Sequence, residues 1–202
     1  MLLRLLSLFA LVFGLSAPVT FSLTAQAQAE SGFAQFIRGG QPRVRHGRHA
    51  SDKSPIPRQT VRSDLPANTI LVDTSERRLY YGLGNGKALK YAVGVGRDGF
   101  TWQGSHRVTR KAEWPGWTPP KQMIAREARK GRKLPAYMEG GPNNPLGARA
   151  LYIGSTLYRI HGTNQPWTIG QAMSSGCIRM ANEDVIDLYK RAGVGTKVVV
   201  RH

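Results

Sequence analysis

The sequence predicts a mainly β domain, of the sandwich or barrel-like type, behind an N-terminal extension. From about Leu65 the chain alternates short β-prone runs with turn residues, and only two segments have a helical pattern. Gly84-Asn85-Gly86 is typical of a tight hairpin turn. The 202 residues are enough for one domain with a substantial core and some additional chain.

Roughly seven strands and two helices are expected from these patterns. The first helix begins at Pro119-Pro120 and ends at Gly131, and the second has Asn182 as its N-cap and Gly193 after its last turn. The expected strands lie in "TILVD", "RRLYYG", "ALKYAVGV", "HRVTRKA", "ALYIG", "TLYRIHG" and "TKVVVRH".

Residues 1–29 have the three parts of a secretory signal peptide. Arg4 provides the basic start, an apolar run follows, and small residues precede cleavage after Ala27 or Ala29. An uncleaved membrane anchor is the alternative, but the apolar run is short for a span. We therefore expect export to the periplasm or cell envelope, with no stable membrane span after cleavage.

Residues 30–63 are predicted to form a flexible, basic, Pro/Gly/Arg-rich linker before a folded domain at 64–202. Its two histidines, His46 and His49, have no other potential metal ligands near them in the sequence. We interpret them as part of a basic tail and not as a metal site, and no metal or cofactor is expected. The formal net charge of +17 favours anionic wall polymers or lipid head groups. Nucleic acid fits this charge but not an export signal.

Cys177, in "SSGCIRM", is the chain's only cysteine. An exported cysteine without a partner can be a buried small hydrophobe, an intermolecular bridge or a nucleophile. The strand before it is expected to end at His161, which could serve as a base for the thiol. Backbone N–H groups at Gly176 and Cys177 could bind an oxyanion, and Arg179 could favour thiolate or hold a substrate carboxylate.

Several motifs resemble the YkuD-type L,D-transpeptidase family. They are "IHGT", then "IG", "SSGCIRM" and the following asparagine, with further matches in "GPNNPLGARALYI" and "GTKVVV". The resemblance covers about residues 66–201. It implies a β-sandwich of mixed sheets with a few short helices, and a cysteine nucleophile.

Carried over by position, Cys177 is similar to the family nucleophile and His161 to its base. The carbonyl of Gly162 would orient the imidazole, and Gly176 and Ser175 would belong to the supporting and oxyanion-hole set. Arg179 would support the loop or bind the substrate.

Two positions depart from the family pattern. Many members have histidine where this chain has Ser175, and "TWQGSH" places Trp102 where the family often has proline. The same segment contains His106, which we expect to be structural rather than catalytic.

The resemblance implies attack by Cys177 on the third residue of a peptidoglycan stem peptide, with release of a terminal D-amino acid. The acyl acceptor could be another stem, a free D-amino acid, an envelope protein or water. Two rival interpretations remain. One is a cysteine-histidine wall-peptide hydrolase, and the other is a basic wall-binding protein without activity.

Overall fold

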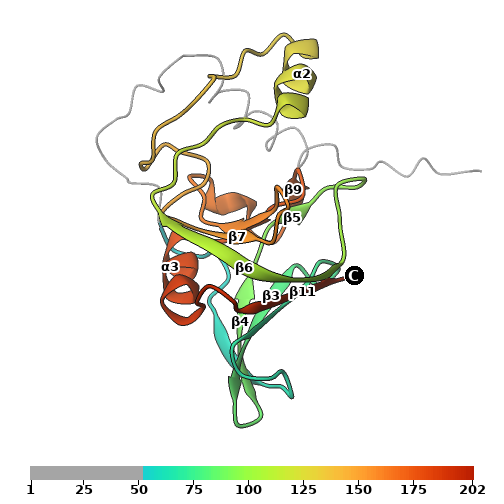
Figure 1. The fold of residues 1–202 in the computed structure, drawn as a ribbon, viewed down its shortest axis with the longest axis vertical. Helices are drawn as coiled ribbons and strands as arrows, with labels where there is room; N and C mark the ends of the chain where they lie inside the picture. The colour runs from blue at the N-terminus through green and yellow to red at the C-terminus, as the bar shows by residue number, and fades with distance from the viewer. Residues whose placement is uncertain (1–51) are drawn as a thin grey trace, which may run out of the picture.

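The computed structural model describes residues 52–202, so the predicted signal peptide and most of the predicted linker lie outside the described residues. Eleven strands, two α-helices and one 3₁₀ turn make up this part of the chain (Figure 1). In chain order they are β1 (Gln59–Arg62), β2 (Thr69–Asp73), β3 (Arg78–Gly84), β4 (Lys87–Ala92), β5 (Val95–Gly96), β6 (Gly104–Glu113), α2 (Lys121–Arg129), β7 (Arg149–Ile153), β8 (Arg159–His161), η1 (Pro166–Thr168), β9 (Ala172–Ser174), β10 (Ile178–Arg179), α3 (Asn182–Arg191) and β11 (Lys197–Arg201).

Nine strands follow one another in the order β1-β4-β3-β2-β11-β6-β7-β8-β10. Strand β6 connects the two halves of this arrangement, because residues 104–107 pair with β11 while residues 108–113 pair with β7. The register shifts between Val108 and Arg110. A bulge of this kind increases local bending and twist, which lets one strand belong to two sheets.

The sheet is mixed, as predicted. Strands β11 and β2 run parallel, as do β10 and β8, whereas the other pairs in this sheet are antiparallel. The predicted hairpin joins β3 and β4, and both Asn85 and Gly86 have positive φ, as a tight hairpin turn requires.

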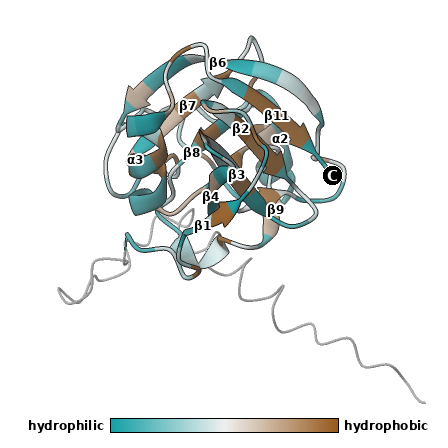
Figure 2. Ribbon diagram, turned by 90° about the horizontal axis from the view of Figure 1, so that it is seen from below, coloured by the Kyte–Doolittle hydropathy of each residue, from teal (hydrophilic) through white to brown (hydrophobic). Residues whose placement is uncertain are grey.

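The main core lies between the two halves of the sheet and the inner face of α3. Its fully buried members include Ile70, Tyr91, Leu151 and Leu188, which come from both halves and from the helix. In Figure 2 the hydrophobic colour gathers on strands in the middle of the molecule, and the outer side of α3 is hydrophilic. Burial of these apolar side chains is the main stabilising contribution to the fold.

Residues 114–147, between β6 and β7, form a separate excursion that includes α2. In Figure 1 this helix stands apart from the strands. A second apolar cluster of Trp117, Leu134 and Leu146, with Met123 and Met138 against it, stabilises the excursion. We call residues 114–147 the lid because, as shown below, they form one wall of the cavity that contains Cys177.

The predicted linker ended at residue 63, and the structure corrects this boundary. Strand β1 pairs antiparallel with β4, from Gln59 opposite Lys90 to Arg62 opposite Lys87. Arg58 also forms an ion pair of 3.1 Å with Asp184, whose side chain is fully buried. The domain therefore begins before Asp64.

The prediction of Asn182 as an N-cap was wrong. Ala181 occupies that position, and no side chain caps the helix. The Oδ1 of Asn182 instead accepts hydrogen bonds from the N–H groups of Ala148 and Thr163, at 3.0 and 3.2 Å. The side chain of Asn182 therefore links the start of α3 to the backbone before β7 and to the backbone just after His161.

Candidate active site

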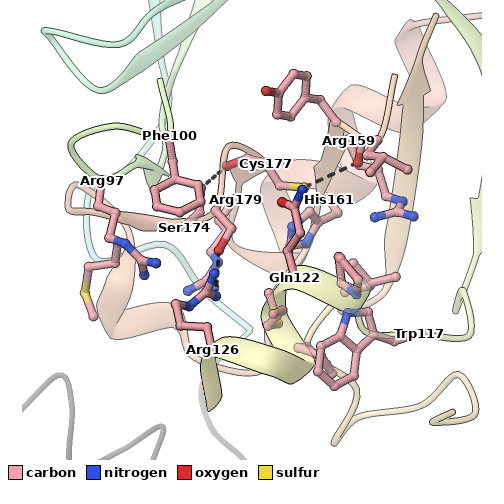
Figure 3. A pocket seen from close by; sticks show the side chains of 18 of the residues that line it. Arg97, Phe100, Trp117, Gln122, Arg126, Arg159, His161, Ser174, Cys177 and Arg179 are labelled. Carbon is pink, nitrogen blue, oxygen red and sulfur yellow. Dashed lines mark hydrogen bonds between the residues drawn. The ribbon is translucent and has the colours of Figure 1, made fainter. Parts of the chain in front are cut away.

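The pairing of β8 with β10 brings Cys177 and His161 together. These strands run parallel, with Ile178 opposite Ile160 and Arg179 opposite His161. Cys177 immediately precedes β10, and His161 is the last residue of β8. Both side chains line one cavity of about 680 Å³, shown in Figure 3.

The loop before Cys177 is held by the side chain of Ser174. Its hydroxyl accepts a 3.1 Å hydrogen bond from the N–H of Gly176 and donates one of 2.6 Å to the carbonyl of Cys177. Gly176 has a φ of 105°, and a Cβ there would collide with the ring of Tyr158. Both facts require glycine at this position.

The N–H of Gly176, which was expected to contribute an oxyanion donor, is bonded to the hydroxyl of Ser174 in this structure. The N–H of Cys177, in contrast, makes no hydrogen bond to another group in residues 52–202. One backbone donor beside the thiol is therefore free for a ligand.

His161 is buried and its tautomer is fixed. Its Nδ1 lies 2.6 Å from the carbonyl oxygen of Gly162, which can only accept a hydrogen bond. Nδ1 therefore carries the hydrogen, and Nε2 keeps its lone pair. Gly162 itself cannot be replaced without displacing Asn182, because a Cβ would collide with that residue's Oδ1.

The imidazole of His161 is held in its neutral form. The pKa of His161 is lowered to about 3, mainly by burial and also by the positive charges of Arg179 and Arg159, while backbone hydrogen bonding to Gly162 and Leu146 opposes this shift. A base that stays unprotonated across the physiological range is available to take the thiol's proton.

Arg179 lies in the cavity beside the thiol and has no carboxylate partner within the described residues. Burial, followed by the nearby Arg97, lowers its pKa, whereas interaction with Cys177 raises it. A guanidinium remains charged despite such a shift. Its positive charge therefore lies within interaction distance of the sulfur of Cys177.

Trp102 donates a hydrogen bond to Gly176 that the sequence did not predict. The indole Nε1 donates to the Gly176 carbonyl at 3.0 Å, and the indole stacks on Tyr158 with ring centroids 4.7 Å apart. Trp102 was read only as a departure from the family pattern, since no local signal connects residue 102 with residue 176.

Ser175 lines the cavity on the side of the lid. Its hydroxyl accepts a 3.2 Å hydrogen bond from the guanidinium of Arg126 on α2. His106 lies outside the cavity, with its ring edge against Trp102 at a centroid distance of 5.6 Å. The structural role expected for His106 stays a prediction.

Within residues 52–202, no group of three His, Cys, Asp or Glu side chains is placed to hold a metal ion. The same part of the chain contains no helix with the length and apolar character needed to cross a bilayer.

A thiol, a neutral imidazole and a free backbone donor lie around one cavity, an arrangement that suits cysteine-dependent acyl transfer. Comparison with known proteins identifies the class. Residues 67–200 match the YkuD family model, described as the L,D-transpeptidase catalytic domain. The chain therefore belongs to the YkuD family.

Two curated relatives from Escherichia coli K12 support this assignment. The chain is 40% identical over 148 residues to the protein named "Probable L,D-transpeptidase YbiS" and 39% identical over 150 residues to "Probable L,D-transpeptidase ErfK/SrfK". The matches include 71% and 72% of this chain but only 47% of each relative. The chain thus spans about half the length of these relatives.

A solved L,D-transpeptidase from Mycobacterium smegmatis has the same fold. The TM-score is 0.51 at 17% sequence identity, and the match covers 66% of this chain and 58% of that one. The predicted β-sandwich of the YkuD type is confirmed.

Proposed function

We propose that this chain is an exported L,D-transpeptidase that acts on peptidoglycan stem peptides through a thioester on Cys177. The observation that carries the proposal is the fixed tautomer of His161, whose Nε2 lone pair is available in the cavity that contains the only thiol. Membership in the YkuD family and relatives named L,D-transpeptidases support the reaction class.

In the first half of the reaction, Nε2 of His161 takes the proton of the thiol while sulfur attacks the carbonyl carbon of the third stem residue. The N–H of Cys177 donates to the oxyanion that develops on the carbonyl oxygen. When the tetrahedral intermediate collapses, the C–N bond breaks, and His161 returns the proton to the departing amino group. A terminal D-amino acid leaves, and the acyl group remains as a thioester.

In the second half, an amine attacks the thioester carbon. The new C–N bond forms as the C–S bond breaks, and His161 transfers the amine's proton to sulfur. The amine of another stem would give a crosslink between third-position residues, a free D-amino acid would give exchange, and an envelope protein would become anchored. Water would give net carboxypeptidase activity.

Export is supported by the signal-like pattern of residues 1–29, and the basic character of the chain suits an anionic wall. Signal cleavage after Ala27 or Ala29 can be read from the N-terminal sequence of the mature protein.

The test is mass analysis of disaccharide-tetrapeptide fragments incubated with the purified protein, with and without an added D-amino acid. We expect loss of the terminal D-alanine with a third-to-third crosslinked product, or incorporation of the added amino acid. Tripeptide alone would indicate the hydrolase. Unchanged fragments with retained binding to wall sacculi would indicate the non-enzymatic wall-binding protein.

A further inference from the structure

We propose that Arg97 and Arg126, both stacked on Phe100, form a binding site for a carboxylate of the acyl-donor peptide. This inference rests on the proposed function and adds a specific recognition element to it. Arg97 and Phe100 follow β5, whereas Arg126 comes from the lid, so the site forms only where the lid meets the domain.

Phe100 holds both guanidinium groups in place. The guanidinium carbon of Arg97 lies 4.4 Å from the centre of the Phe100 ring, and that of Arg126 lies 5.6 Å from it. Stacking of this kind orients the planar guanidinium and leaves its N–H groups free at the edge. In Figure 3 these three residues lie on one side of Cys177, and Arg159 and Trp117 lie on the other.

Arg97 has no anionic partner in residues 52–202. Burial and the charge of Arg126 both lower the pKa of Arg97, with a smaller opposing effect from Glu127. A buried guanidinium that lies near a second one and has no carboxylate of its own, as Arg97 does, is a favourable place for an external anion.

The single carboxylate of Glu127 is shared between Arg126 and Arg132, so the cationic groups around the cavity outnumber it. Glu127 is the only acidic residue that lines the cavity, and Arg132 already binds its carboxylate through two nitrogens. Arg126 donates from Nε to the other oxygen of the same carboxylate at 3.4 Å, and from Nη2 to the hydroxyl of Ser175. The remaining charged groups around the cavity are Lys130, Arg159 and Arg179, all cationic.

A stem peptide offers several carboxylates, on its second residue, on the side chain of a third-position diamino diacid and at its terminus. A planar, paired guanidinium site suits a carboxylate better than a hydroxyl or an amide, which carry no charge. Because Arg97 follows the strand that pairs with β9, and β9 leads into the Cys177 loop, a carboxylate held there would fix the donor relative to the thiol.

The experiment compares four donor peptides that differ in one carboxylate each. One is the parent acid; the others carry an amide at the second residue, a lysine in place of the diamino diacid, or an amide at the terminus. The kcat and KM of each donor are measured for the natural chain, Arg97→Gln and Arg126→Gln. Arg129→Gln is the matched control, because Arg129 is on the same helix, is exposed and does not line the cavity.

We expect one modified donor to have a KM roughly tenfold higher than the parent acid with the natural chain, reflecting one lost charge-assisted contact. Arg97→Gln and Arg126→Gln should abolish this difference in KM, because they raise the KM only of donors that keep the carboxylate. Arg129→Gln should preserve the difference. The donor that is affected identifies which carboxylate binds. Equal KM for all four donors, or a loss that falls on kcat alone, would overturn the inference.

Binding of the same peptides to Cys177→Ala, measured by calorimetry, separates this inference from the proposed function. If no donor is turned over but binding still depends on the carboxylate and on Arg97, the function is wrong and the binding site stands. If donors are turned over and binding shows no such dependence, the site is wrong and the function stands. The absence of binding by all four peptides would overturn both.

Discussion

The indole Nε1 of Trp102 lies 3.0 Å from the carbonyl oxygen of Gly176, the residue before the cysteine. The Gly176–Cys177 peptide has that carbonyl at one end and the N–H of Cys177 at the other. A hydrogen bond to the carbonyl therefore sets the direction of the N–H. Trp102 is a positioning residue, acting through this peptide on the proposed oxyanion donor.

Trp102→Phe removes the indole donor while keeping an aromatic ring against Tyr158. We expect kcat to fall by about tenfold with KM little changed, because a misaligned donor affects mainly the transition state. Steady-state release of the D-amino acid measures this, and Trp167→Phe, at an exposed tryptophan outside the cavity, is the control. Wild-type kcat in Trp102→Phe, with its fold intact, would show that the hydrogen bond does not position the donor.

Replacement of His161 and replacement of His106 should have very different effects on turnover. His161→Ala removes the proposed base and should reduce kcat by about 10²–10⁴-fold. His106→Ala should retain most of the activity, because His106 contacts the edge of Trp102 and lies outside the cavity. Turnover assays on both variants, with circular dichroism to verify folding, check the prediction; the opposite order would exchange their roles.

Arg179→Gln should raise the pKa of His161. Burial is the largest cause of the low value, so the pKa should move upward from about 3 yet remain below the ordinary value of 6.5. The sign follows from charge, since the cationic guanidinium disfavours imidazolium and its removal relieves that effect. Titration of the ¹³C-labelled His161 ring by NMR measures the shift, and an unchanged or lower pKa would contradict the electrostatic assignment.

Cys177→Ser should be almost inactive. A hydroxyl is much harder to ionise than a thiol, and the imidazole is oriented here by a carbonyl rather than a carboxylate. Intact-protein mass spectrometry with a donor peptide should show an acyl adduct on the natural chain and none on the serine variant. An adduct elsewhere in the chain, or efficient transpeptidation by serine, would refute the mechanism.

The structure changes what is expected of a shortened protein. A chain that starts at Asp64 loses β1 and also Arg58, the ion-pair partner of the buried Asp184. Removing one partner of a fully buried ion pair destabilises a fold by about 3–5 kcal/mol, and by less where the partner is partly exposed, as Arg58 is. We therefore expect residues 64–202 to unfold at a lower temperature than residues 52–202.

Arg58→Gln within the 52–202 protein isolates the ion pair from the strand, and Arg62→Gln, at an exposed position in β1, is its control. Thermal unfolding followed by circular dichroism compares all four proteins. Equal midpoints for the two lengths would mean that β1 and Arg58 contribute nothing to the domain.

Sequence patterns predicted the central strands and both helices because those segments are bounded by strong local signals. Ile70 and Val72 alternate with polar or half-buried neighbours, and Gly131, just after α2, has the positive φ that commonly ends a helix. Strand β1 was missed because three of its four residues are exposed, which leaves no apolar alternation to detect. The expected strand "TLYRIHG" is shorter in the structure, where β8 covers only Arg159–His161.

The cysteine and histidine were found from spacing and motif, but the surrounding geometry was not. Asn182 is a residue type that often caps a helix. Its side chain instead accepts hydrogen bonds from Ala148 and Thr163, which come close to it only in the folded chain. The contact of Ser175 with Arg126 joins residues 49 positions apart, across a lid whose orientation depends on its own small core. Such contacts depend on tertiary packing and leave no periodic trace in the sequence.

The position of β11 between β2 and β6 has a consequence for how the domain folds. This strand pairs with β2 over Lys197 to Arg201 and with β6 over Lys197 to Val200. The two halves of the sheet therefore join only when three segments that are far apart in the sequence meet. Pairings of such long sequence separation slow folding, because the intervening chain must be ordered before the contacts can form.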